Sequence, residues 1–101
     1  MIEDEANIRN FVKTLLVTNQ YQVFTATNAA EGLFELRVHC PDLVLLDLGL
    51  PDQDGLDLLV EIRKESMIPV IVLSARYDDI VLSEDTTYFI TKDFGKYGAM
   101  N

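Results

Sequence analysis

Two short runs of apolar residues, Leu43–Leu46 and Val70–Leu73, constrain the fold most. Both are apolar throughout instead of alternating with polar residues, which predicts strands that are buried on both faces. Between the two runs, Leu56, Leu59, Val60 and Ile62 line a helix. Strands of this kind that alternate with helices indicate a parallel sheet with helices on both of its faces.

The same patterns divide the whole chain into alternating helices and strands. Asn28 lies three residues before Glu31, which predicts a capping box at the start of a helix. A weakly patterned segment, residues 76–87, precedes the last strand. The expected elements are helices over residues 4–18, 29–38 and 55–65, and strands over residues 21–26, 42–47, 69–75 and 88–91. The 101 residues, 49% of them apolar, then form one α/β domain, residues 1–101.

Composition excludes several classes of function. The 17 acidic and 8 basic side chains give a net charge of −9, which argues against direct binding to nucleic acid. The single cysteine, Cys40, forms no internal disulfide. No segment approaches the roughly 20 apolar residues of a membrane span, and the first residues contain no apolar run typical of a signal peptide. We therefore expect a cytoplasmic protein that contacts no membrane.

Polar residues follow the predicted strands at their carboxyl ends. Asp47, Ser74 and Lys92 stand at or just after the ends of three strands, and three further acids, Glu3, Asp4 and Glu5, stand at the start of the first helix. Because ligands of open α/β sheets bind outside the carboxyl ends of the strands, we expect these side chains to converge. Carboxylates can hold a hard cation beside a phosphoryl group. Asp47 would be the nucleophile, with Ser74 and Lys92 contacting phosphoryl oxygens.

These residues, at this spacing, resemble a known family. An acidic cluster lies near the start, Asp47 is followed by Leu50-Pro51 and Asp54-Gly55, and "VLSA" and "TK" come later. The combination resembles the receiver domain of response regulators in two-component signalling. The segment "LDLGLPDQDG" is similar to the kdp-type members of the OmpR/PhoB class. The resemblance implies a flavodoxin-like fold.

The resemblance also implies a role for each position. Asp47 would accept phosphate from a sensor histidine kinase, and the chain would be no enzyme beyond catalysing its own phosphorylation and dephosphorylation. Ser74 would be the hydroxyl that shifts toward the phosphate, Lys92 its ion partner and Phe89 the aromatic switch. The site for Mg²⁺ would comprise the acidic pair Glu3 and Asp4, Asp47, and the backbone carbonyl of Gly49.

Two parts of the family pattern are short in this chain. Members begin with an apolar strand, whereas only Met1 and Ile2 precede Glu3. After Lys92, the sequence "DFGKYGAMN" contains two glycines, which disfavour the family's last helix. We expect residues 21–26 to pair directly with the strand that ends at Asp47, or a strand from another chain to enter. The apolar surface left on one sheet face predicts self-association, with strand exchange as one route, or else a marginally stable monomer.

Two alternative functions remain open. An aspartate-based phosphohydrolase of the haloacid-dehalogenase type would carry an acid two residues after the nucleophile, where this chain has Gly49. A receiver-like interaction module that no longer takes phosphate would follow if the truncated strand and helix disabled the site.

Overall fold

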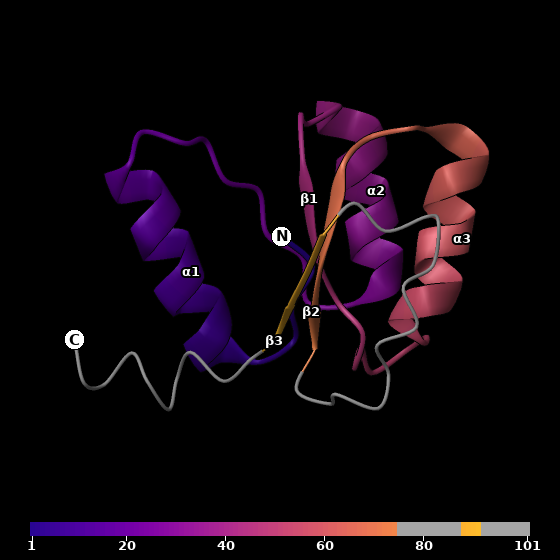
Figure 1. Cartoon of the computed structure of the whole chain (residues 1–101), viewed down its shortest axis with the longest axis horizontal. Coiled ribbons are helices and arrows are strands. Elements are labelled where there is room, and N and C mark those ends of the chain that lie inside the picture. Colours follow the sequence, from indigo (N-terminus) through magenta and orange to yellow (C-terminus); the bar gives the residue numbers. More distant parts are fainter. Residues whose placement is uncertain (75–87, 92–101) are drawn as a thin grey trace.

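The computed structural model describes residues 1–74 and 88–91. From α2 to β2, helices and strands alternate as the apolar pattern predicts, and the three strands form one parallel sheet with helices on both sides (Figure 1). The elements are α1 Ala6–Thr18, α2 Ala29–His39, β1 Val44–Asp47, α3 Gly55–Glu65, β2 Val70–Ser74 and β3 Tyr88–Thr91. The expected weakly patterned segment 76–87 and the expected loss of the last helix both lie outside the described residues.

The register of the sheet brings the carboxyl ends of its strands to one edge. β1 pairs with β2 from Val44–Val70 to Asp47–Leu73, and β2 pairs with β3 from Ile71–Tyr88 to Ser74–Thr91. Because all pairs are parallel, the carboxyl ends of the three strands lie at one edge. The core between the sheet and the helices is built from aliphatic side chains, the most deeply buried being Leu46, Leu58, Leu59, Ile62, Val70 and Val72.

The first residues pair differently from the expectation. Ile2 forms parallel bridges to both Ala26 and Leu46, so it lies between them. The expected direct pairing of residues 21–26 with β1 is therefore wrong. The expected strand over residues 21–26 is also wrong, because only Ala26 takes part in a bridge. Because the bridges are formed by Ile2 alone, residues 21–25 have no neighbouring strand to pair with, and they do not form one themselves.

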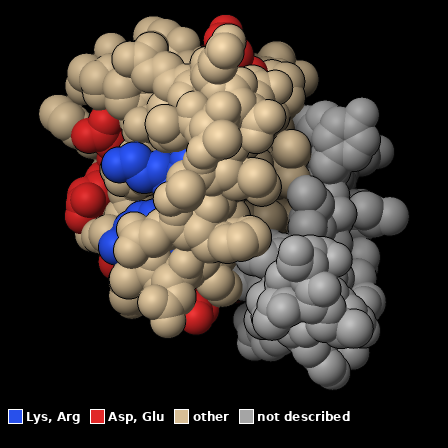
Figure 2. All heavy atoms as spheres, turned by 90° about the vertical axis from the view of Figure 1, so that its left-hand side faces the viewer, with Lys and Arg blue, Asp and Glu red and all other residues tan. Residues whose placement is uncertain are grey.

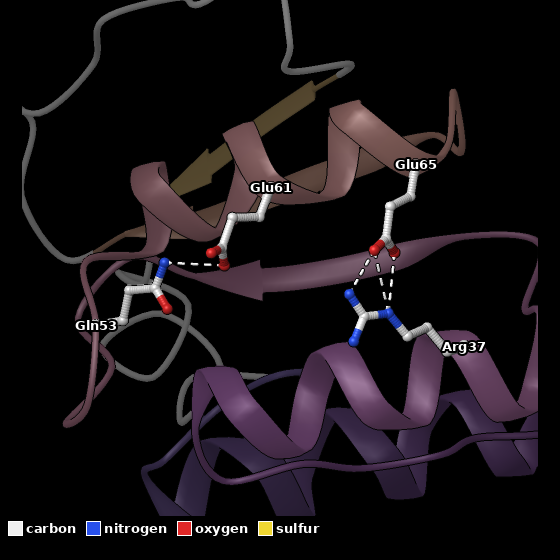
Figure 3. A network of polar contacts seen from close by, with 4 residues as sticks. All are labelled: Arg37, Gln53, Glu61 and Glu65. Atoms are coloured by element: carbon white, nitrogen blue, oxygen red, sulfur yellow. Dashed lines mark hydrogen bonds and ion pairs between the residues drawn. The ribbon is translucent and has the colours of Figure 1, made fainter.

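Two helices cover one face of the sheet. α2 and α3 lie on the same side (Figure 1), and an ion pair between Arg37 and Glu65 links them (Figure 3). The predicted start of α2 is confirmed: the Asn28 side chain accepts a hydrogen bond from the Glu31 backbone N–H at 2.8 Å, and the Glu31 carboxylate accepts one from the Asn28 side-chain amide at 2.8 Å. α3 begins and ends at the predicted residues, and the Asp54 side chain caps it at 2.9 Å from the Leu56 nitrogen.

The helix on the opposite side is much less buried. α1 begins at Ala6, two residues later than expected, because the extended pairing of Ile2 continues to Glu3, whose N–H donates to the Ala26 carbonyl. Its apolar residues Phe11 and Leu15 are 53% and 54% exposed. The surface on the α1 side consists largely of residues that are neither acidic nor basic (Figure 2). Within the described residues, no helix is both long and apolar enough to cross a membrane.

Gly55, the first residue of α3, provides a test of this packing. A Cβ atom there would lie 2.5 Å from the Asp47 carbonyl oxygen and 2.6 Å from the Leu48 Cα, and backbone atoms cannot move aside cheaply. Alanine gains up to about 1 kcal/mol over glycine in a helix. We expect the clash to outweigh this gain, so that Gly55→Ala lowers the free energy of unfolding by about 1–3 kcal/mol in urea titrations.

Gly49→Ala is the matched control, because its Cβ would meet only the Asp47 Oδ1, at 3.8 Å. Equal free energies of unfolding for the two variants would contradict the close approach of α3 to the end of β1.

Candidate functional site

Three acidic side chains converge at the carboxyl end of β1. Glu3, Asp4 and Asp47 each place a carboxylate oxygen within 4.8 Å of the others. Glu3 is fully buried and Asp47 is 4% exposed, whereas Asp4 is exposed. This brings together the acidic pair and the strand-end aspartate, as the sequence predicts.

Backbone pairing explains why the acids meet. The Ile2 N–H donates to the Leu45 carbonyl at 2.8 Å, and the Ile2 carbonyl accepts from the Asp47 N–H at 2.9 Å. These bonds run the first residues parallel to β1, so that Glu3 and Asp4 follow at the end where Asp47 stands. The Arg9 guanidinium donates to the backbone carbonyls of Glu3 and Asp4 at 3.0 and 3.2 Å.

The electrostatics of the cluster favour a cation. Two unit charges at this range repel by roughly 3 kcal/mol at an effective dielectric constant of about 20, and burial adds a desolvation cost for Glu3 and Asp47. Carboxylate oxygens are the ligands that hard divalent cations prefer. The donor set therefore fits such an ion, which would offset the repulsion.

The loop after Asp47 continues along the site. The Gly49 N–H donates to the Asp47 Oδ1 at 3.0 Å, which places the Gly49 backbone beside the carboxylate. Leu48 and Leu50 are buried and anchor the loop in the core. The Gly55 N–H donates to the Leu48 carbonyl at 3.0 Å and closes the loop where α3 begins. The predicted contribution of the Gly49 carbonyl to a metal site stays a prediction.

The other predicted residues are placed by strand register. Ser74 is the last residue of β2, directly after the residue that pairs with Asp47, so its backbone lies at the same edge. Phe89 lies in β3 opposite Val72, two residues before the strand ends. Lys92 follows β3 immediately and lies outside the described residues. The structure thus brings Ser74 to the edge with Asp47, and it does not place Lys92.

Sequence reasoning missed Asp52. Its two carboxylate oxygens accept hydrogen bonds from the backbone N–H groups of Ala29 and Ala30, at 2.8 and 3.0 Å. These bonds, that of Ala29 above all, hold the pKa of Asp52 below its ordinary value. The partners are 23 and 22 residues away in the chain. No local sequence pattern predicts a contact over that separation. The sequence alone therefore gives no sign that Asp52 is more than a loop residue.

The sequence has clear relatives. The profile of the response regulator receiver domain family matches residues 1–98. The KDP operon transcriptional regulatory protein KdpE of Escherichia coli is 40% identical over 94% of this chain and 44% of its own length. The virulence transcriptional regulatory protein PhoP of Salmonella typhimurium is 39% identical over 93% of this chain and 44% of its own length. The chain thus spans less than half the length of these relatives.

Solved structures agree with the family match. The receiver domain of the Francisella response regulator 1452 superposes with a TM-score of 0.84 at 28% identity, covering 98% of this chain and 86% of that chain. The response regulator TrrA from Thermotoga maritima, in complex with Mg²⁺-BeF, gives a TM-score of 0.82 at 30% identity, covering 98% and 90%. The flavodoxin-like fold that the sequence predicts is confirmed.

The acidic cluster predicts two effects of Asp4→Asn on stability, one without Mg²⁺ and one with it. Asp4→Asn removes one of three mutually repelling charges, so we expect the ion-free variant to melt at a higher temperature than the parent. With a hundred-fold excess of Mg²⁺ over its Kd, the parent should gain about 2.7 kcal/mol of stability and the variant clearly less. Thermal unfolding with and without Mg²⁺ measures both effects.

Asp57→Asn is the control, because Asp57 is an exposed acid in the first turn of α3 and removes the same charge elsewhere. If Asp57→Asn reduced the gain from Mg²⁺ as much as Asp4→Asn, the effect would come from net charge and not from the cluster.

Proposed function

Because the chain belongs to the response regulator receiver domain family, we propose that Asp47 is its phosphoacceptor, taking phosphate from a sensor histidine kinase with Mg²⁺ bound beside it. The observation that carries this proposal is the buried cluster, in which the carboxylate oxygens of Asp47, Glu3 and Asp4 lie within 4.8 Å of one another. Receiver domains are regulatory, and they receive phosphate from sensor histidine kinases. An external substrate is no part of the proposal, which limits catalysis to the domain's own phosphorylation and dephosphorylation.

In the proposed reaction, a carboxylate oxygen of Asp47 attacks the phosphorus of a phosphohistidine. The bond between phosphorus and the histidine nitrogen breaks, its electron pair stays on the imidazole, and the imidazole takes up a proton. The product is an aspartyl phosphate, a mixed anhydride. The strand end and the bond from the Gly49 N–H hold the attacking carboxylate in place, so that positioning contributes much of the rate.

The remaining residues of the proposal serve the transferred group. Glu3, Asp4, Asp47 and the Gly49 carbonyl would hold Mg²⁺, which supplies neutralisation of the charge on the phosphoryl oxygens. The Ser74 hydroxyl would bind one phosphoryl oxygen and the Lys92 ammonium another. Movement of Ser74 toward the phosphate would let Phe89 change position, which would turn phosphorylation into a change of surface.

Membership of the receiver domain family also suggests the partners of the chain. The chain as a whole, residues 1–101, would be one domain that docks on a kinase in the cytoplasm, and its net charge of −9 disfavours direct contact with nucleic acid. A phosphohydrolase is disfavoured, because Gly49 stands where the second acid would be and the family match is to receivers. A phosphorylation-impaired interaction module is the competing hypothesis, and labelling decides between the two.

Asp47→Asn tests the phosphoacceptor. The variant keeps the shape of the side chain and loses the nucleophilic carboxylate, so we expect labelling by acetyl phosphate and Mg²⁺ to fall to background in intact-mass spectrometry. Asp42→Asn, which changes an exposed acid just before β1, should label like the parent. Labelling of Asp47→Asn at the parent's stoichiometry would exclude Asp47. A parent that stays unlabelled, yet folded, would favour the interaction module.

Self-association through the α1 side is a further part of the proposal. Phe11 and Leu15, one turn apart on this helix, are each more than half exposed, and soluble monomers rarely expose large apolar patches. We expect Leu15→Glu to lower the average mass in light scattering at high protein concentration. Val60→Glu, which places the same charge at a 48% exposed site on α3, should leave it unchanged. A parent that is monomeric at every concentration would contradict this expectation.

A further inference from the structure

Asp52 links two parts of the chain that lie far apart in sequence. The first two N–H groups of α2, those of Ala29 and Ala30, donate to the Asp52 oxygens at 2.8 and 3.0 Å. The next N–H group, that of Glu31, donates to the side chain of Asn28 at 2.8 Å. The start of α2 therefore has two side-chain caps, one local and one from the loop between β1 and α3. A negative carboxylate is also favourable at a helix N-terminus.

The loop that carries Asp52 also carries Gly49. The loop is also bonded to both neighbouring strands, through the Gly49 N–H to Asp47 and the Leu48 N–H to the Leu73 carbonyl, and its last residues contact α3, where the Asp54 side chain caps the helix and the Gln53 amide donates to Glu61 at 3.1 Å. Figure 3 shows Gln53 reaching from the loop toward Glu61 on α3. The bonds of Asp52 differ, because they lead from the loop to α2.

The start of α2 is in turn joined to the acidic pair. Ala26, three residues before Ala29, accepts a hydrogen bond from the Glu3 N–H at 2.9 Å and bridges Ile2. Asp52 thus connects the loop on one side of the acidic cluster, where the Gly49 N–H contacts Asp47, with the start of α2. Through Ala26, the chain just before α2 is in turn bonded to the segment that carries Glu3 and Asp4.

We propose that Asp52 is a positioning residue for the acidic site. By tying residues 48–54 to α2, it fixes the Gly49 backbone beside Asp47 and holds the loop at a constant distance from the acidic pair. The cluster is then formed before a divalent cation arrives, so that binding does not have to order the loop. This inference rests on the proposed function, because it assigns Asp52 a role in the site that binds Mg²⁺.

The test is a titration of the full chain with Mg²⁺ alone, followed by the backbone amide signals of Gly49 and Asp47 in NMR spectra. Loss of a residue that orients metal ligands weakens metal binding by about 10-fold or more, which we expect for Asp52→Ala. Asp52→Asn keeps one acceptor oxygen for α2 and should lie between Asp52→Ala and the parent. Faster hydrogen exchange of the Gly49 amide in Asp52→Ala, without any ion, is a second expected result.

Asn28→Ala is the matched control, because it removes the local cap of the same helix without touching the loop. It should lower the melting temperature as Asp52→Ala does, but leave the Kd for Mg²⁺ and the exchange of the Gly49 amide unchanged. An unchanged Kd in Asp52→Ala, or the same loss in Asn28→Ala, would overturn the inference. If Asp52→Ala did not fold, the comparison of Asp52→Asn with Asn28→Ala would decide in the same way.

Failure of this inference can be told apart from failure of the proposed function. A parent that binds Mg²⁺ and labels on Asp47, with all variants equal to it in affinity, overturns the role of Asp52 alone. A parent that binds Mg²⁺ and loses affinity in Asp52→Ala, but takes no phosphate, supports the role of Asp52 and overturns the phosphoacceptor. A parent that binds no Mg²⁺ overturns both the metal site and the inference.

Discussion

The backbone hydrogen bonds of Ile2 are the interaction on which the rest of the structure depends. This residue, 4% exposed, donates to Leu45 and accepts from Asp47, while its neighbour Glu3 donates to Ala26. One buried residue therefore joins β1 to the segment before α2. Gly32 permits α2 to lie directly on it, because a Cβ there would come within 2.5 Å of the Ile2 Cδ1. Without this pairing, nothing in the described contacts would bring Glu3 and Asp4 to Asp47.

The arrangement concentrates negative charge at the carboxyl end of β1. Asp47 is held by the sheet through its own N–H and by the Gly49 N–H through its side chain. Burying Glu3 and Asp47 together costs stability, which proteins tolerate where the charges serve a site. A divalent cation would convert this cost into binding, because its positive charge offsets both the carboxylates and the negative charge that a phosphoryl group adds. The same edge carries the end of β2, so a group on Asp47 would lie near Ser74 as well.

Much of this could be predicted from the sequence, because the decisive signals are local. The apolar run that ends at Asp47, the capping box at Asn28 and the stripe from Leu56 to Ile62 each specify one element. The parallel order of these elements then brings Asp47 and Ser74 to one edge. The pairing of Ile2 could not be predicted in this way, since two residues show no periodicity. Asp52 was missed because its partners in α2 are distant in the chain. The amphipathic pattern of α1 predicts the helix correctly, but a stripe does not determine how deeply it is buried.

The central claim is that the cluster at Asp47 binds a cation and a phosphoryl group together. Beryllofluoride mimics a phosphoryl group on a carboxylate, so a titration followed by backbone amide signals tests the claim most directly. We predict that beryllofluoride with Mg²⁺ shifts the signals of Glu3, Asp47, Gly49 and Ser74 beyond any change that Mg²⁺ alone causes, and that beryllofluoride without Mg²⁺ causes no shifts. Unchanged signals at these positions with millimolar beryllofluoride and Mg²⁺, in a chain that is folded, would contradict it.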